Sequence, residues 1–352
     1  MFSNKKIAVA MSGGVDSSYV AMFYKEAGAE VFGITGLMTS DEASIEVVKN
    51  SKAVCDFLGI EHYVVDLSDS FEKEVIDYFK NSYQQGLTPN PCVVCNRKIK
   101  WGKLKDFAMN SLGADFFATG HYAKLQKEAD GYKLYHAKDE KKDQLYVLCC
   151  LTQEDFDRTL FPMGDIDKNT AKQACLEKNL PCKNSKESQD ICFIPRPDTT
   201  KKFLIRALGE KEGDFVDINT KKIRGKHSGF YLYTTGQRKG IGLSNPEPLY
   251  VTGTDACRNI VYVGLKNNLY TDSLEICDVN IQQERYKNSE FRAMVKVRYN
   301  TTPKPARVIT TGNTAKIFFD EPESSITPGQ ACAIYDEKNT FLIGGGWICK
   351  KI

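Results

Sequence analysis

Short apolar runs alternate with amphipathic stretches through the first 83 residues of the chain. The β-branched run at residues 5–10 ends in Ser-Gly-Gly, and the following stretch carries apolar residues at helical spacing as far as Gly28. The same alternation continues through residues 30–37, 41–60, 61–67 and 68–83. Such a βαβαβα series predicts a parallel sheet covered on both faces, with ligands bound at the carboxyl ends of its strands.

The pattern changes further along the chain. A helical stretch at 97–112 and a short strand at 115–119 extend the first pattern, and an Asp-Gly turn within 122–150 predicts a hairpin added to the same domain. Beyond residues 195–200, glycines and short β-type runs replace the helical spacing. We therefore expect an α/β parallel-sheet domain at 1–197, a small mixed or β domain at 198–270 and a C-terminal β-barrel at 271–352.

Length and composition bound the class of protein. The chain has 352 residues, 41% of them hydrophobic and 26% charged, which is ordinary globular usage and argues against disorder or a fibrous repeat. No stretch approaches the roughly 18 consecutive apolar residues of a membrane span, and the N-terminus lacks a signal-peptide cleavage site. We expect a cytoplasmic protein with no membrane partner, whose twelve cysteines are mostly reduced thiols.

Basic residues are unevenly distributed, although the net charge of +3 is too small to indicate a nucleic-acid partner. Residues 196–310 contain twenty Lys/Arg against twelve Asp/Glu, and no acid interrupts the window 221–239. Phe230, Tyr231 and Tyr233 lie among these basic residues. Clustered cations with interleaved aromatic residues predict a surface that binds nucleic-acid phosphates. A solvated loop of ordinary charge is the alternative.

Residues 12–18 read Ser-Gly-Gly-Val-Asp-Ser-Ser and join the first predicted strand to the first helix. Glycines allow an anion close to the backbone, amides at the helix start point at it, and Ser12 and Ser17 add hydroxyl donors. Asp16 would repel phosphate unless it holds a magnesium ion or positions the amides of the loop. Because the Walker lysine is missing, the loop resembles the pyrophosphatase loop of enzymes that cleave ATP between its α and β phosphates. A plain Gly-Ser helix cap is the alternative.

Cys92 and Cys95 form a Cys-x-x-Cys motif within residues 86–101. The pair is compatible with half of a zinc site, with a redox pair or with a nucleophile. No second such motif exists and the four histidines are scattered, so we favour a nucleophile. The basic residues that follow predict a lowered thiol pKa and a thiolate at neutral pH; they are Arg97, Lys98 and Lys100.

Cys192 follows a polar turn in residues 186–195, which we expect to be exposed. On spacing alone, a lone cysteine is more often a small buried hydrophobic residue than a reactive thiol. Its significance therefore depends on the motifs elsewhere in the chain.

An ordered series of motifs extends over all three predicted domains. Besides residues 12–18 and 86–101, it comprises ATGHYA (118–123), KDQLYVL (142–148), SQDICFIP (188–195), YTTGQRKGIG (233–242), VRYN (297–300), ITPGQACAIY (326–335) and GGGW (344–347). This series resembles the bacterial tRNA-specific 2-thiouridylase family. The first loop alone would be shared with several ligases and sulfurtransferases, but the whole series is highly specific.

The resemblance implies a Rossmann-like ATP-pyrophosphatase domain that inserts sulfur at C2 of the wobble uridine of tRNA, using ATP and Mg²⁺. ATP adenylates the carbonyl oxygen, and AMP leaves when a sulfur nucleophile attacks C2. By motif correspondence, Cys192 bears the persulfide, and Cys95 is the partner thiol that releases the sulfur and ends in a disulfide with Cys192. Asn90, Pro91 and Cys92 correspond to the segment that touches the target base. Some family members carry a carboxylate in place of Cys92, so the resemblance supports no acid–base role for this side chain.

The same correspondence assigns binding residues, and no site for a resident metal ion is expected. ATP contacts are implied for Ala10, Met11, Ser12, Gly13, Gly14, Val15, Asp16 and Ser17, with Met38 and Gly120 on the adenine side. Contacts to tRNA are implied for His121, Lys142, Asp143, Gln144, Arg298, Tyr299 and Gln330. The implied partners are wobble-uridine tRNAs, those for Lys, Glu and Gln, and a sulfur donor such as a cysteine desulfurase or a sulfur-relay carrier.

Two other functions stay open from the sequence. Another adenylating ligase built on the same loop would need neither the pair of Cys95 and Cys192 nor basic β domains. A non-catalytic RNA-binding protein would use its cysteines to hold zinc, which metal analysis of the purified protein would detect.

Overall fold

The computed structural model describes residues 2–184, 191–194 and 197–351, which form two compact units. The first unit comprises residues 1–75, 92–193 and 340–342. The second comprises residues 76–91, 194–339 and 343–352. The segment 76–91 therefore belongs to the second unit, although it lies in the N-terminal half of the chain.

A five-stranded parallel sheet forms the centre of the first unit, as far as the described residues show, in the order β3-β2-β1-β4-β7. The strands are β1 (Lys6–Ala10), β2 (Glu30–Leu37), β3 (Glu61–Asp66), β4 (Phe116–Ala118) and β7 (Thr159–Leu160). The chain passes from β1 to β2 and β3 on one side and then crosses to β4 on the other. In open α/β sheets the ligand crevice lies where the strand order reverses, which here is between β1 and β4. The predicted α/β fold is confirmed.

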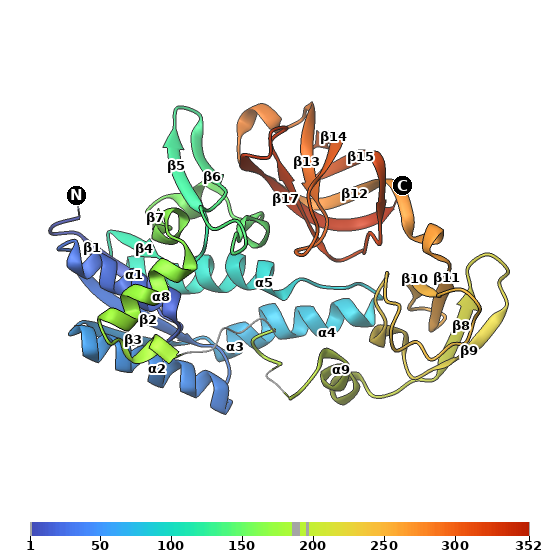
Figure 1. Cartoon of the computed structure of the whole chain (residues 1–352), viewed down its shortest axis with the longest axis horizontal. Coiled ribbons are helices and arrows are strands. Elements are labelled where there is room, and N and C mark those ends of the chain that lie inside the picture. Colours follow the sequence, from blue (N-terminus) through green and yellow to red (C-terminus); the bar gives the residue numbers. More distant parts are fainter. Residues whose placement is uncertain (1, 185–190, 195–196, 352) are drawn as a thin grey trace. The chain divides into compact units, whose positions relative to one another are not determined.

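Of the three longer helices of this unit, α1 and α2 pack on this sheet and α8 packs against α1 (Figure 1). They are α1 (Val15–Glu26), α2 (Glu42–Leu58) and α8 (Lys168–Glu177). Apolar side chains of β1, α1, α2 and α8 form one buried cluster that includes Val20 and Cys175. The ends of α2 follow from the sequence: the Asp41 carboxylate accepts a hydrogen bond from the Ser44 N–H (2.8 Å), and Gly59 ends the helix with a φ of 60°.

The helical stretch predicted at 97–112 is not a regular α-helix. A π-helix spans Cys95–Leu104, between α5 (Pro91–Val94) and α6 (Lys105–Asn110). Its buried residues include Cys95, Ile99 and Trp101. Wider turns of this kind are rare and occur frequently at functional sites. Other short helices of this unit are α3 (Ser68–Phe71), a π-helical turn that begins at Glu72 and ends at Ile76, and α7 (Gln153–Phe156).

The predicted hairpin consists of β5 (Lys124–Glu128) and β6 (Gly131–Tyr135). It belongs to the first unit, as expected from the sequence, but it does not pair with the parallel sheet. Instead β6 pairs with Phe341 and Leu342. The edge strand of the parallel sheet on that side, β7, has two residues and therefore presents few backbone groups for pairing.

A small mixed sheet in the second unit has the strand order β10-β11-β8-β9. Its strands are β8 (Gly213–Asp217), β9 (Ile223–His227), β10 (Tyr250–Asp255) and β11 (Ile260–Gly264). Strands β11 and β8 are parallel, whereas the other two pairs are antiparallel. The helices of this unit are α4 (Asp77–Gln84) and α9 (Thr200–Leu208), which are joined by an edge-to-face contact between Phe79 and Phe203.

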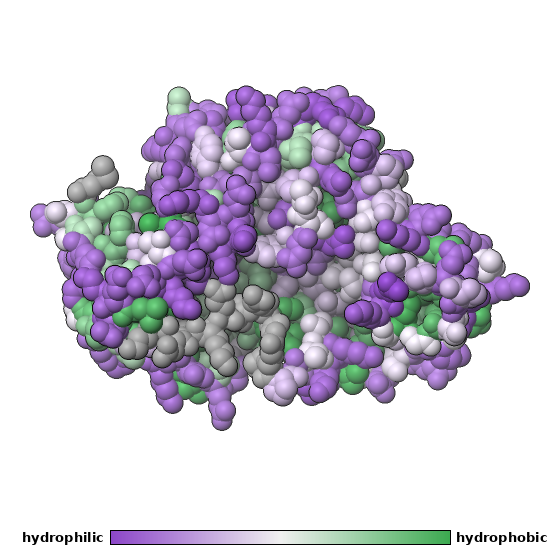
Figure 2. Space-filling model, viewed as in Figure 1, coloured by the Kyte–Doolittle hydropathy of each residue, from purple (hydrophilic) through white to green (hydrophobic). Residues whose placement is uncertain are grey.

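An antiparallel barrel completes the second unit, with the strand order β12-β15-β14-β13-β16-β17 and closure by pairing of β12 with β17. The strands are β12 (Tyr270–Ile281), β13 (Glu290–Lys296), β14 (Lys304–Thr311), β15 (Thr314–Ser324), β16 (Ala331–Tyr335) and β17 (Phe341–Lys351). Buried and accessible residues alternate along β14, and the barrel surface seen in Figure 2 is mostly hydrophilic. The predicted barrel is confirmed.

One disulfide, between Cys277 and Cys349, joins β12 to β17. The other ten cysteines are free thiols, and all twelve lie in the described residues. Most thiols are therefore reduced, as predicted. The sequence did not point to this pair, which is separated by 72 positions.

Candidate active site

The loop after β1 exposes the amino end of α1 at the point where the strand order reverses. Gly13 has a φ of 69°, and a Cβ added there would lie 2.6 Å from Cβ of Asn50, so only glycine fits. Gly14 is the N-cap residue and has no side chain to cap the helix. The Ser12 N–H donates to Oγ of Ser17 (3.2 Å), which orders the loop. The loop thus has the geometry of an anion site at a helix N-terminus.

The carboxyl end of β4 meets this loop at Gly120. A Cβ added to Gly120 would lie 3.0 Å from Cβ of Asp16 and 3.1 Å from the backbone nitrogen of Ser17. A larger residue would therefore crowd the first turn of α1. Met38, which directly follows β2, is half-buried at the same carboxyl edge of the sheet.

Asp16 is held by two residues from distant parts of the chain. Nζ of Lys168, the first residue of α8, lies 2.7 Å and 2.8 Å from the two carboxylate oxygens. The Tyr122 hydroxyl donates to Oδ1 of the same carboxylate (2.7 Å). We did not predict Lys168 as a site residue, because 152 positions separate it from Asp16 and no local motif marks it.

Gln144 fixes the backbone of Tyr122. The Tyr122 N–H donates to Oε1 of Gln144 (3.0 Å), and the Gln144 N–H donates to the Tyr122 carbonyl (2.9 Å). The neighbouring Asp143 accepts hydrogen bonds from the N–H groups of Ala137 and Leu145. Both side chains, expected at the tRNA, thus make internal contacts that hold the loop after β4, whereas Lys142 is half-buried.

Three thiols lie close enough in the first unit to influence one another electrostatically: Cys92, Cys95 and Cys192. Cys95 is buried at 9% exposure, whereas Cys92 and Cys192 are exposed. The Lys100 ammonium acts on all three. The structure therefore brings together the two cysteines predicted as catalytic, although 97 positions separate them and no disulfide joins them. Residues 188–190 and 195 of the Cys192 motif lie outside the described residues.

The expected lowering of the Cys95 pKa is wrong. Burial raises the pKa of Cys95 to about 12, against a smaller lowering by Lys100. Desolvation likewise raises the pKa of Cys192 to about 11 and raises that of Cys92. The sequence showed the cations after Cys95 but not the depth of its thiol, and desolvation outweighs one nearby charge.

His121 is part of the loop after β4, is buried, and packs against the π-helix. Lys100 donates to Nε2 (3.4 Å), which assigns the ring proton to Nδ1, where it bonds Oγ1 of Thr119 (2.8 Å). The indole of Trp101 lies 5.4 Å from the imidazole, centroid to centroid. Burial and Lys100 hold the His121 pKa well below its usual value, so the ring is neutral. His121, expected as a tRNA contact, therefore also orients Lys100.

In the second unit, Gln330 is bonded to the segment that precedes Asn90. Its Nε2 donates to the Pro89 carbonyl (3.1 Å), and the Thr88 N–H donates to the Pro328 carbonyl (2.9 Å). The turn at 326–330 thus holds the chain just before the half-buried Asn90 and the buried Pro91, which are the residues expected at the target base.

Arg298 and Tyr299 lie just beyond the end of β13. Nη2 of Arg298 donates to the Ser324 carbonyl (3.3 Å). Tyr299 is 43% exposed, and Nζ of Lys296 lies 5.6 Å from the centre of its ring. An exposed aromatic ring beside a cation suits contact with a nucleic acid.

The aromatic residues of the basic window do not form a surface. Phe230, Tyr231 and Tyr233 are each at most 9% exposed and pack in the core, so this part of the interpretation is wrong. Apolar side chains at these positions gain more from burial than from a solvated platform. The cations Lys222 and Arg224 are exposed.

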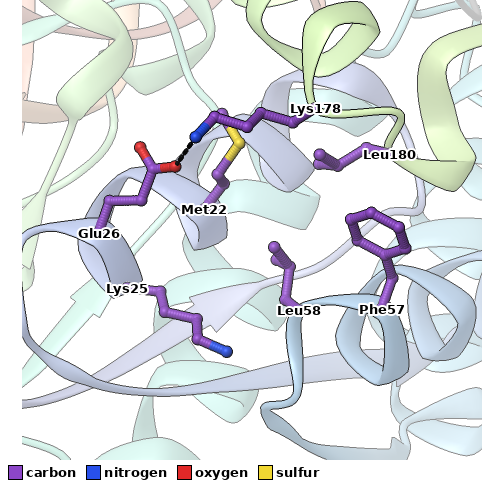
Figure 3. A pocket seen from close by; sticks show the side chains of 7 residues that line it. All are labelled: Met22, Lys25, Glu26, Phe57, Leu58, Lys178 and Leu180. Atoms are coloured by element: carbon purple, nitrogen blue, oxygen red, sulfur yellow. Dashed lines mark ion pairs between the residues drawn. The ribbon is translucent and has the colours of Figure 1, made fainter.

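A separate hollow of about 460 Å³ lies beside the carboxyl end of α1 (Figure 3). Met22, Leu58 and Leu180 supply apolar walls, and the ion pair of Glu26 with Lys178 (2.9 Å) lies at its edge. None of the predicted site residues lines it. The candidate site is therefore at the other end of α1.

Two features of the described residues bear on metals and membranes. No group of three or more His, Cys, Asp or Glu side chains is arranged there to hold a metal ion. None of the described helices is both long and apolar enough to cross a membrane.

The domain composition defines a class of tRNA-modifying proteins. Residues 5–196 match a tRNA methyl transferase HUP domain, residues 201–265 a tRNA methyl transferase PRC-barrel domain, and residues 271–348 an aminomethyltransferase β-barrel domain.

The chain belongs to the tRNA-specific 2-thiouridylase family. It is 40% identical to the tRNA-specific 2-thiouridylase of Carboxydothermus hydrogenoformans and 37% identical to that of Clostridioides difficile, over 100% of both chains in each case. Among solved structures, it resembles a U34-tRNA thiolase of Methanococcus maripaludis, with 18% identity, a TM-score of 0.38, and coverage of 54% of this chain and 61% of that chain. This last likeness is too weak to carry an argument.

Proposed function

We propose that this chain is an ATP-dependent tRNA uridine 2-sulfurtransferase, which adenylates the wobble uridine and replaces its C2 oxygen with sulfur. Membership of the 2-thiouridylase family supports the reaction. The observation that carries the residue assignment is that Cys92, Cys192 and Lys100 all act electrostatically on the buried thiol of Cys95, in the unit that also contains the loop after β1.

In the first step the uridine oxygen attacks the α-phosphate of ATP, pyrophosphate leaves, and the C2 oxygen becomes part of an AMP leaving group. The amides of residues 13–17 bind the phosphates. Mg²⁺ fits Asp16, because this ion binds through one or two carboxylates together with phosphate oxygens, and the carboxylate already faces a cation. When bound, the ion supplies positive charge to the phosphates.

In the second step the outer sulfur of a Cys192 persulfide attacks C2 and AMP departs. The Cys95 thiolate then attacks Sγ of Cys192, which breaks the persulfide S–S bond, leaves the sulfur on uridine and forms a disulfide between the two cysteines. An external thiol reductant returns both to thiols, and a sulfur donor renews the persulfide. Desolvation raises both pKa values in the chain alone, so in this proposal bound tRNA changes the environment in which the thiolates form.

The family resemblance supports the rest of the proposal. In this proposal the substrates are the wobble-uridine tRNAs for Lys, Glu and Gln, and the sulfur comes from a cysteine desulfurase or a relay carrier. The proposed domain boundaries are 1–197, 198–270 and 271–352, and the proposed location of the protein is the cytoplasm. Arg298, Tyr299 and Lys142 are its proposed tRNA contacts in described, accessible positions.

The test incubates the full chain with unmodified tRNA, Mg²⁺-ATP and a persulfide donor, then identifies nucleosides and phosphate products by mass spectrometry. We expect 2-thiouridine, AMP and pyrophosphate. Cys95→Ser and Cys192→Ser are each expected to abolish 2-thiouridine, whereas Cys257→Ser, at an exposed thiol, is the matched control. A methylated nucleoside, ADP with orthophosphate, or full thiolation by the Cys95→Ser protein would contradict the proposal.

Cys175→Ser would not be a suitable control for these variants. Cys175 is completely buried, and its thiol faces the Val15 carbonyl at 3.8 Å beneath the loop. A buried hydroxyl there is expected to lower stability by about 1–2 kcal/mol.

A further inference from the structure

We propose that Lys168 is the residue that binds the β- or γ-phosphate of ATP, the role for which the loop after β1 has no lysine of its own. This inference rests on the proposed use of ATP. It assigns a nucleotide-binding function to a helix that the sequence motifs do not mark.

The ammonium of Lys168 already lies at the mouth of the loop. It contacts both oxygens of Asp16, and Asp16 lies in the first turn of α1, whose amides face the anion site. The Lys168 side chain is 14% exposed and that of Asp16 is 31% exposed, so the pair is partly withdrawn from water but open to a ligand. A lysine in this position meets the end of a polyphosphate held by the loop amides.

The fold places Lys168 independently of Asp16. Asp167 caps α8 by accepting a hydrogen bond from the Thr170 N–H (2.9 Å), and the Lys168 N–H donates to Asp139 (3.1 Å). Ala171 and Cys175, three and seven positions further along the helix, are completely buried. Because such spacing keeps residues on one helix face, Lys168 continues the face that packs against α1.

We infer that Lys168 exchanges its partner, Asp16, for a phosphate group when ATP binds. Without nucleotide, Asp16 places a negative charge beside amides that serve a negative ligand, and Lys168 neutralises it. Phosphate oxygens of ATP carry more charge than one carboxylate and compete for the ammonium. Lys168 then binds phosphate, and the carboxylate of Asp16 turns to the magnesium ion that accompanies ATP. No covalent bond and no proton has to move.

Titration calorimetry with Mg²⁺-ATP, Mg²⁺-pyrophosphate and AMP tests the assignment. Lys168→Met is expected to weaken binding of ATP and pyrophosphate by about 10- to 100-fold, the value of a charge-assisted hydrogen bond, and to leave AMP nearly unchanged. Lys168→Arg is expected to restore most of the affinity. Lys172→Met, on the exposed face of the same helix, is the matched control and is expected to bind all three as the wild type does.

A second set of variants, made in the Asp16→Asn protein, separates phosphate binding from simple neutralisation of Asp16. In that protein the side chain at position 16 carries no charge for Lys168 to neutralise. If Lys168 binds phosphate, Lys168→Met is therefore expected to weaken pyrophosphate binding as much in the Asp16→Asn protein as in the wild type. Disappearance of the effect in that background would overturn the inference. Thermal unfolding of each variant checks that the proteins are folded, and the double variant, which leaves no unpaired charge, is expected to be more stable than Lys168→Met.

Failure of this inference differs from failure of the proposed function. If the wild type binds ATP and releases pyrophosphate while Lys168→Met binds pyrophosphate equally well, only the role of Lys168 is wrong. If the wild type binds no ATP, or releases ADP, the proposed function itself is wrong.

Discussion

The hydroxyl of Tyr122 donates a 2.7 Å hydrogen bond to Oδ1 of Asp16, across 106 positions of sequence. Gln144 in turn holds the backbone of Tyr122 through two hydrogen bonds. Residues of three separate motifs are therefore connected at one carboxylate. The connection brings the segments after β1 and β4 into direct contact, although neither segment shows this alone.

Tyr122→Phe tests this connection. Removal of one hydrogen bond to a charged group is expected to lower the free energy of unfolding by about 1–3 kcal/mol and to weaken ATP binding several-fold, because the carboxylate loses a fixed orientation. Denaturant unfolding and calorimetry measure both effects. Tyr132→Phe is the control, since Tyr132 lies on β6 and its hydroxyl donates to Asp157 (3.2 Å), which follows α7. Unchanged ATP affinity would separate Tyr122 from the nucleotide site.

Gly120→Ala tests the close approach of β4 to the loop. Its Cβ would press on the Asp16 side chain and on the backbone nitrogen of Ser17 at 3.0–3.1 Å, so the first turn of α1 has to shift. We expect ATP binding to weaken at least tenfold with a loss of stability below about 1.5 kcal/mol. Gly253→Ala, where an added Cβ meets no atom within 4 Å, is the control. Normal ATP affinity in Gly120→Ala would show that the amide of Ser17 does not serve the nucleotide.

The raised thiol pKa values predict a slow, pH-dependent reaction with iodoacetamide in the absence of RNA. Alkylation of Cys192 is expected to accelerate as the pH rises toward about 11, and that of Cys95 toward about 12. Because Lys100 lowers both pKa values, Lys100→Met is expected to slow alkylation of Cys192 at a given pH, whereas Lys98→Met, at an exposed residue, is not. Rapid modification of Cys192 at neutral pH, measured by peptide mass spectrometry, would show that its thiolate forms without tRNA.

His121 predicts an acid-sensitive contribution to stability. Its pKa is lowered in the folded protein, so the unfolded chain binds the proton first as the pH falls below 6.5. The free energy of unfolding therefore decreases from pH 6.5 downward, until the folded-state pKa is passed. His121→Gln is expected to reduce this slope in urea titrations but not remove it, because burial also lowers the pKa of His62 and His227. An unchanged slope would show that His121 is not the main acid-sensitive histidine.

Charge reversal tests the basic window as a tRNA surface. Lys222→Glu with Arg224→Glu is expected to weaken tRNA binding at least tenfold and to flatten its dependence on salt, because each lost phosphate contact removes about one unit of the logarithmic slope. ATP binding serves as the internal check and is expected to stay unchanged. Lys316→Glu, at an exposed barrel residue, is the control. If the Lys222→Glu, Arg224→Glu protein bound tRNA as tightly as the wild type does, the basic window would not be a tRNA-binding surface.

The alternation of strand and helix could be predicted from the sequence because its period is local, and the loop could be placed after β1 for the same reason. The π-helix at Cys95–Leu104 could not be predicted, because the spacing of its apolar residues is that of an α-helix. Its wider turn depends on tertiary packing. The pairing of the hairpin with Phe341 could not be predicted either, because it depends on a segment far away in the sequence.

The site could be predicted in its residue types but not in its electrostatics. Counting the cations near Cys95 gave the wrong direction for its pKa, because burial of the thiol is a property of the fold. The aromatic residues at 230–233 lie in the core for the same reason. Lys168 was missed because an ion pair over 152 positions leaves no mark on either segment.

The distance in sequence between Asp16 and its partners has a consequence during synthesis of the chain. A ribosome that has made the loop and α1 has yet to add Tyr122, and Lys168 follows later still. Domains fold as their residues emerge, and long-range contacts form slowly. The nascent chain therefore carries an unneutralised Asp16 until α8 has been translated and packed against α1, so a fragment ending before Lys168 is expected to leave the nucleotide site unfinished.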